Sequence, residues 1–136
     1  MPVIEAETAA TLTGKLLQMA SGFIYETKRV FADELEERVK VVRTPHILHD
    51  HKLERLDGIL DDMREQNERV VVVYHFKPSL ERLMKRYPKA RVMDKEGRLV
   101  KDWNEGKIDL LFLHAQSAGH GLNMQKGGRV MVFFDL

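Results

Sequence analysis

In the second half of the chain, short uninterrupted apolar runs alternate with segments of helical spacing. The runs are VVVVYHF (70–76), ARVM (90–93), IDLLFLH (108–114) and RVMVFF (129–134), and the helical patterns cover 78–87 and 98–106. The run that begins at Val70 lacks the two-residue alternation of a half-exposed strand, so we expect both faces of the sheet to be covered. The pattern predicts an α/β fold in three layers, with a mainly parallel sheet and helices on both faces.

Two longer helical patterns precede this region. Residues 7–20 space their apolar side chains at helical intervals, and Gly22 follows as a stop signal. Residues 49–68 predict a second helix, with Asp50 as a candidate N-cap and one apolar face, formed by Leu53, Leu56, Ile59, Leu60 and Met63.

The segment between these helices is mixed. FIYE (23–26) and VKVV (39–42) resemble short strands, and the charged residues 31–39 between them predict a helical turn or an exposed excursion. Since no linker or repeat interrupts the 136 residues, we expect a single domain. Its lead-in helix and irregular segment occupy 1–48, and its α/β core occupies 49–136.

Composition excludes several classes of protein. With 22 Lys and Arg against 21 Asp and Glu, the net charge is +1, so any polyanion site must be local. The chain has no cysteine, which excludes disulfides and thiolate metal sites. Glu5 and Glu7 stand where a signal peptide would be basic and then apolar, and no apolar run has the roughly 18 residues that span a bilayer. We therefore expect a cytoplasmic protein with no membrane partner.

A glycine-containing loop follows the run 108–114. Gly119 and Gly121 lack side chains, so successive N–H groups in 115–125 could converge on a phosphate. The glycines could equally do no more than turn the chain into a short helix at Leu122, and their spacing alone does not decide. The chain lacks a G-x-x-x-x-G-K-[ST] sequence and the third glycine of the dinucleotide fingerprint. ATP hydrolysis by the chain alone is therefore not expected.

The residues around this loop resemble a known family. SAGHGLNMQ (117–125), preceded by IDLLFLH and followed by GGRVMVFFD, is similar to motif V of superfamily II helicases, in the form found in Swi/Snf-type ATPases and their phage and prophage relatives. DWNEGK (102–107) resembles the segment that flanks motif V, and VVVVYHF resembles the motif IV strand. TGKLLQMASGFIY (13–25) resembles the lead-in to the second lobe.

The resemblance implies that this chain is the second RecA-like lobe of a DNA-dependent ATPase. In the family, the motif V loop contacts the phosphate backbone of DNA without reading sequence, and couples that contact to ATP bound between two lobes. Carried over by position, the residues of this loop are Ser117, Gly119, His120, Gly121, Asn123 and Gln125. Lys77, after the motif IV strand, is a candidate phosphate contact, although a solvated surface lysine needs no such role.

The chain also departs from the family. It contains no segment that resembles motif VI, whose arginines reach ATP, and no Walker A or Walker B sequence. The resemblance implies that ATP and Mg²⁺ are bound mainly by an N-terminal RecA-like lobe of the same parent protein, so we expect the 136-residue chain alone to be inactive. The alternative is a non-enzymatic α/β module that binds a nucleotide or a partner protein.

Two further patterns have simpler interpretations. His46, His49 and His51 could suggest a metal site, but histidines at a helix start are more often caps or surface residues, and no carboxylate pattern completes a ligand set. Trp103 could stack on a base, but an isolated aromatic residue in a helix more often packs that helix against the sheet. We expect no metal, and we expect Trp103 to be part of the core.

Overall fold

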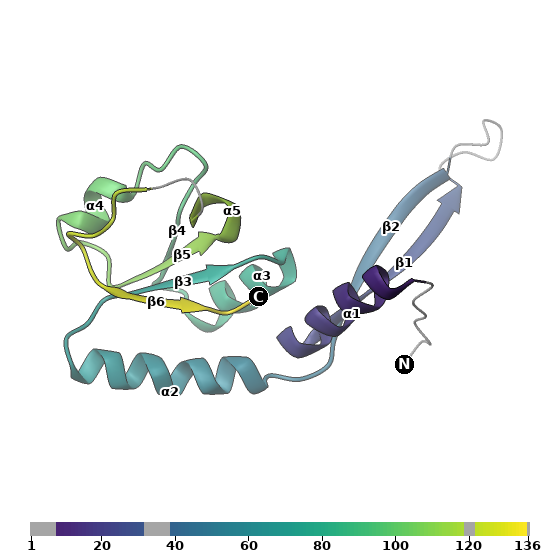
Figure 1. The fold of residues 1–136 in the computed structure, drawn as a ribbon, viewed down its shortest axis with the longest axis horizontal. Helices are drawn as coiled ribbons and strands as arrows, with labels where there is room; N and C mark the ends of the chain where they lie inside the picture. The colour runs from purple at the N-terminus through teal and green to yellow at the C-terminus, as the bar shows by residue number, and fades with distance from the viewer. Residues whose placement is uncertain (1–7, 32–38, 119–121, 136) are drawn as a thin grey trace. The chain divides into compact units, whose positions relative to one another are not determined.

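The computed structural model describes residues 8–31, 39–118 and 122–135. The chain divides into two compact units, Met1–Asp50 and His51–Leu136, each of which is described by itself (Figure 1). In the part of the chain that is described, no helix is long and apolar enough to cross a membrane.

The first unit begins with α1, Ala9–Ser21. The Thr8 side chain caps its first turn by accepting a hydrogen bond from the Thr11 N–H at 3.1 Å. Gly22 ends the helix in the left-handed conformation, with φ of 98°, and donates its N–H to the Met19 carbonyl at 3.0 Å. The helix predicted at 7–20, with its stop at Gly22, is therefore confirmed.

A two-stranded antiparallel sheet completes this unit. Strands β1 (Phe23–Phe31) and β2 (Val39–Ile47) pair from Phe23↔Ile47 to Phe31↔Val39. Both predicted strands exist but are longer than the four residues expected for each, because pairing with a partner extends a strand beyond its most apolar part. The predicted excursion at 31–39 lies almost entirely outside the described residues.

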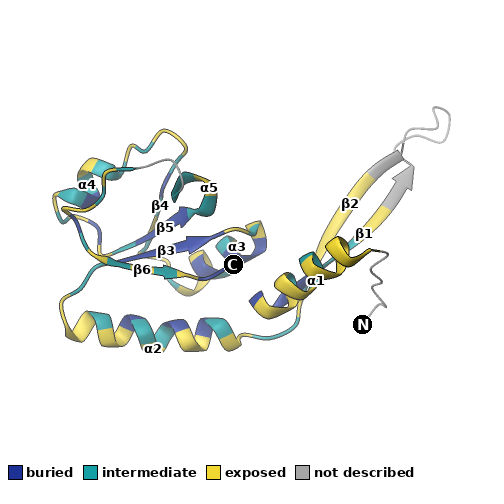
Figure 2. Cartoon of the chain, in the orientation of Figure 1, coloured by how far each residue is buried: buried dark blue, intermediate teal, exposed yellow. Residues whose placement is uncertain are grey.

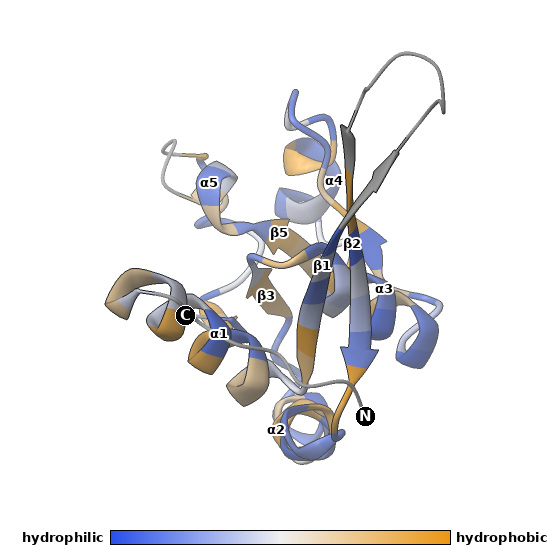
Figure 3. Ribbon diagram, turned by 90° about the vertical axis from the view of Figure 1, so that its right-hand side faces the viewer, coloured by the Kyte–Doolittle hydropathy of each residue, from blue (hydrophilic) through white to orange (hydrophobic). Residues whose placement is uncertain are grey.

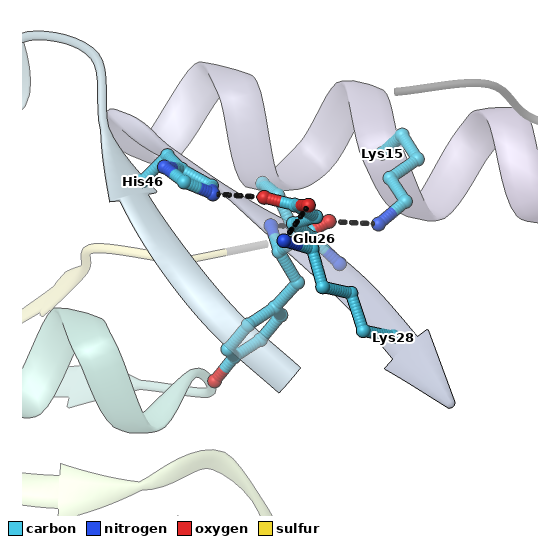
Figure 4. Close-up of polar contacts among 6 residues, drawn as sticks. Lys15, Glu26, Lys28 and His46 are labelled. Carbon is cyan, nitrogen blue, oxygen red and sulfur yellow. Dashed lines mark hydrogen bonds and ion pairs between the residues drawn. The ribbon is translucent and has the colours of Figure 1, made fainter. Parts of the chain in front are cut away.

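Polar side chains join the two strands and α1 (Figure 4). Glu26 lies 2.6 Å from His46 Nε2 and 3.0 Å from Lys28 Nζ. From α1, Lys15 Nζ donates to the Tyr25 carbonyl, and Gln18 Oε1 accepts from the Tyr25 N–H at 2.9 Å. These two bonds satisfy backbone groups on β1 that no neighbouring strand pairs. The Lys28 and then the His46 hydrogen bonds hold the pKa of Glu26 below its ordinary value.

The second unit contains a parallel sheet of four strands in the order β4-β5-β3-β6. The strands are β3 (Val70–Tyr74), β4 (Arg91–Val92), β5 (Leu110–His114) and β6 (Val130–Phe133). Val70 is paired with both Leu110 and Val130, which fixes the register at the centre of the sheet. The predicted parallel sheet is confirmed.

Helices cover both faces of this sheet. Helices α2 (His51–Glu65) and α3 (Lys77–Arg86) pack on one face, and α4 (Val100–Asn104) and α5 (Ala115–Ala118) pack on the other. Alternate residues of β3 point to opposite faces, so Val72 joins the core with α2 while Val71 and Val73 join the core with α4. Strands β3 and β5 are the buried, apolar centre (Figures 2 and 3). This arrangement is the predicted three-layer α/β fold.

Two elements are shorter than the sequence pattern suggests. Strand β4 contains two residues, and α4 contains five residues instead of the nine expected over 98–106. Gly97 and Gly106, with φ of 70° and 79°, stand on either side of α4. Since a left-handed residue interrupts a helix, α4 cannot include Gly106, the last residue of the predicted span.

Candidate functional site

The carboxyl ends of the parallel strands meet at one edge of the sheet, where ligands bind in open α/β folds. Strand β3 leads into His75 and Phe76, β5 leads directly into α5, and β6 leads into Phe134 and Asp135. The segment that resembles motif IV therefore ends at the same edge at which the segment that resembles motif V begins.

Asp135 binds the turn after β3. Its side chain is buried, with 3 % exposed, and Oδ2 accepts hydrogen bonds from the His75 and Phe76 N–H groups at 2.9 and 3.0 Å. Oδ1 accepts from the buried Ser79 hydroxyl at 3.0 Å. One carboxylate therefore joins the end of β6, the end of β3 and the first turn of α3, and it fixes the backbone from which Lys77 extends.

Lys52 of α2 also binds the end of β6. Its Nζ donates to the Phe134 carbonyl at 2.6 Å and lies 5.6 Å from the centre of the Phe134 ring. Burial lowers the pKa of Lys52, and the neighbouring Asp135 carboxylate opposes that effect. Helix α2 therefore stabilises this edge by a charged bond in addition to its apolar face.

His114, the last residue of β5, is bonded at both ring nitrogens. Nε2 donates to the His75 carbonyl at 3.2 Å, and Nδ1 accepts from the Gln116 N–H at 3.1 Å. This pattern corresponds to a neutral ring with its proton on Nε2. His114 thus joins the ends of β3 and β5, and neither nitrogen is available for proton transfer in this arrangement.

The loop after α5 is attached to α4. Both helices cover the same face of the sheet, and the attachment lies away from the carboxyl edge. Trp103 Nε1 donates to the Met124 carbonyl at 2.9 Å, and Asn104 Nδ2 donates to the Asn123 carbonyl at 2.7 Å. Asn104 Oδ1 accepts from the Gly127 N–H at 3.1 Å. Because α4 holds the loop by its backbone, the side chain of Asn123 remains exposed.

Close packing explains the pair of glycines in this loop. A Cβ atom on Gly127 would lie 2.3 Å from the Trp103 carbonyl oxygen and 2.5 Å from its ring, and one on Gly128 would lie 3.0 Å from the ring. Trp103 is 1 % exposed, so the ring cannot move aside without disturbing the core. The expectation that Trp103 is a core residue is confirmed.

The structure separates the predicted site residues into two groups. Ser117 lies on α5, and the exposed Lys77 begins α3, so both are near the carboxyl edge. Asn123 and Gln125 lie further along, in the loop that α4 holds, with exposed side chains. Gly119, His120 and Gly121 lie outside the described residues, so the proposed phosphate-binding turn itself stays a prediction.

Sequence reasoning missed three residues that shape this site: Asp135, Ser79 and Asn104. Two signals were present in the sequence: Asp135 comes just after the apolar run 129–134, and Ser79 stands in the first turn of the helix that follows the run 70–76. The hydrogen bond between them could not be predicted from the sequence, because Ser79 and Asp135 are 56 residues apart.

The three histidines considered as metal ligands have other contacts. His46 contacts Glu26, and His49 Nε2 donates to the Met19 carbonyl at 2.8 Å. Across residues 8–31, 39–118 and 122–135, no group of three or more His, Cys, Asp or Glu side chains is arranged to hold a metal ion.

No protein-family model matches the chain. The chain is similar to protein p41 of Acyrthosiphon pisum secondary endosymbiont phage 1, with 43 % identity over 131 residues, which cover 96 % of this chain and 25 % of p41. It therefore spans about a quarter of the length of this curated relative. The chain is related to a phage protein.

Proposed function

We propose that the chain is the second RecA-like lobe of a phage-type, Swi/Snf-related, ATP-dependent DNA helicase or translocase. In this proposal Lys77 and Ser117 at the carboxyl edge, together with Asn123 and Gln125 in the loop that α4 holds, contact the DNA backbone, and that loop couples the contact to ATP. The phage relative is consistent with the proposal, and its greater length leaves room for another lobe in a longer parent protein.

One observation carries the proposal. The two sequence segments with the most specific resemblance, DWNEGK (102–107) and the loop that begins at Ser117, are joined by three hydrogen bonds. They are further joined by the contact that requires glycine at 127. The segment that resembles motif V and the segment that resembles its flank are therefore in direct contact in the structure.

The proposed DNA contact is chemically simple. Exposed amides such as Asn123 and Gln125 can donate to phosphate oxygens, and Lys77 can add one positive charge. These groups would position a strand without reading its bases. With a net charge of +1, few phosphates would be neutralised, so we expect weak, salt-sensitive DNA binding by the chain alone.

The residues of this chain do not fit an ATP and Mg²⁺ site of their own. The sequence has no Walker A loop, and the described residues contain no cluster of acidic side chains that could hold the metal. In the proposal, a first lobe of the parent protein binds the nucleotide.

Steady-state ATP hydrolysis, with and without DNA, tests the proposal on this chain and on the longest open reading frame that contains it. We expect DNA-stimulated turnover in the longer protein alone, and its loss on Gly121→Leu. Gly58→Leu is the matched control, because Gly58 is exposed on α2 and nothing lies within 4 Å of a Cβ there. Absence of turnover in a folded longer protein would contradict the proposal and favour a binding module.

A further inference from the structure

A run of cations lies at the opposite, amino-terminal edge of the sheet. The stretch RLMKRYPKAR (82–91) holds five Lys and Arg residues and no acid, in a chain whose net charge is only +1. It includes the last turns of α3, the following turn and the first residue of β4. Cations in the last turn of a helix complement its dipole, which accounts for Lys85 and Arg86. The helix dipole does not account for Lys89 and Arg91, which come after the end of the helix.

The second part of this stretch, residues 86–91, lines an open hollow of about 570 Å³ together with Arg64 and residues 107–110. Its lining includes the apolar residues Ala90 and Ile108 and the acidic residue Asp109, and its cations come from α2, α3, β4 and the turns beside them. The volume falls within the range of roughly 300–1,000 Å³ that is usual for ligand sites. A second hollow, of about 370 Å³, shares Arg64, Asp109 and Leu110 with the first and extends the depression toward β3.

Three of the six cations that line the two hollows already have firm partners. Arg86 donates to Asp57, and this pair lowers the pKa of the Asp57 carboxyl. Lys107 lies 3.0 Å from Glu105. Arg69 donates to the Gly127 carbonyl at 3.2 Å.

Three cations are left with weak compensation or none. Arg64 has only a loose contact with Asp61, at 3.9 Å, and its side chain is 82 % exposed. Lys89 and Arg91 make no ion pair or side-chain hydrogen bond with the residues that the structure describes. A phosphate bound here would therefore gain charge partners without breaking existing ones.

We propose that this hollow binds the phosphodiester backbone of a nucleic acid strand, through Arg64, Lys89 and Arg91. The hollow and its extension run across the ends of neighbouring strands, which suits a linear polyanion better than a single compact ion. The choice of nucleic acid as the phosphate carrier rests on the proposed function. The five residues of β3 put this edge about 16 Å from the carboxyl edge, so the contact is separate from the one proposed for Lys77 and Ser117.

Amide NMR titrations of the 136-residue chain test the proposal, with sodium pyrophosphate and with a 12-nucleotide single-stranded DNA as probes. We expect both probes to shift the amides of residues 89–91 and 107–110. We also expect Lys89→Glu with Arg91→Glu to weaken DNA binding about tenfold and to reduce the salt slope by about 0.7 for each lost contact. Lys95→Glu, an exposed lysine away from the hollow, is the matched control and should bind as the native chain does.

Three results have distinct meanings. If neither probe shifts these amides, or if the double variant binds DNA as the Lys95→Glu control does, the proposal is overturned. Shifts with pyrophosphate alone would overturn the nucleic-acid assignment and indicate a small phosphate ligand. DNA shifts at the hollow without any at 115–118 or 122–125 would support this proposal while contradicting the DNA contact of the proposed function.

Discussion

Single residues in this protein have roles that depend on what lies within a few ångströms of them. Gly127 has no room for a side chain against Trp103, whereas Gly14 has nothing within 4 Å of a Cβ. The sequence alone does not distinguish these two glycines. Their environments give opposite expectations for the same substitution.

Gly127→Ala should therefore lower the free energy of unfolding by about 1–3 kcal/mol, because the new methyl group overpacks against a buried ring and a backbone oxygen. Thermal or urea unfolding measures the effect. Gly14→Ala is the matched control, and we expect it to leave stability unchanged or raise it slightly. Equal effects of the two variants would contradict the packing described here.

Asp135→Asn tests the buried carboxylate at the carboxyl edge. An amide cannot accept at both positions, so one of the three donors from His75, Phe76 and Ser79 would face an N–H₂ group. We expect a loss of about 2–3 kcal/mol of unfolding free energy. Asp61→Asn, whose side chain is 71 % exposed, should change stability by less than about 0.5 kcal/mol.

At the scale of an element, the β1–β2 sheet carries a pH-dependent contribution from Glu26. Lys28, and then His46, lower the pKa of this carboxyl in the folded state. A group whose folded pKa is lowered stabilises fully above its unfolded value, and loses that effect as the pH falls through the folded value. The paired strands should therefore weaken on the acid side of the ordinary Glu value of 4.5.

Amide protection factors of β1 and β2, corrected for intrinsic exchange rates, measure this at pH 7 and below pH 4. We expect protection in the native chain to fall on acidification, and Glu26→Gln to be less protected at pH 7 with a smaller pH dependence. A native chain and variant with the same pH dependence would show that the contacts around Glu26 contribute nothing measurable.

At the scale of the whole molecule, the buried apolar residues are divided unequally between the two units. Only Phe23 and Ile24 are buried apolar side chains in the described part of the first unit, whereas both core clusters belong to the second. We therefore expect a polypeptide of residues 51–136 to fold by itself. NMR spectra of that polypeptide and of the full chain should overlap for β3 and β5, and an unfolded spectrum would instead support one cooperative domain.

Local pattern was sufficient for the class of fold and for most elements, although the short helix α5 (Ala115–Ala118) stands where the sequence predicted a loop. Valine runs such as 70–73 predicted strands that are covered on both faces, and Gly22 and Pro78 marked the end of one helix and the start of another. Pattern was less reliable for length. Residues 98–106 have helical spacing, but α4 contains only Val100–Asn104 and the left-handed Gly106 is outside it. Strands β1 and β2 are longer than predicted because they pair with each other.

For the candidate site, the sequence by itself determined which residue types follow each strand, because alternating strands and helices force a parallel sheet whose carboxyl ends share an edge. The sequence did not show which of these residues contact one another. Asp135 binds His75, and Trp103 contacts Gly127, although each pair is far apart in the sequence; only the assembled sheet brings them together. Tertiary structure also decided which cations are already paired and which remain exposed, since an ion pair depends on distance in space and not on order along the chain.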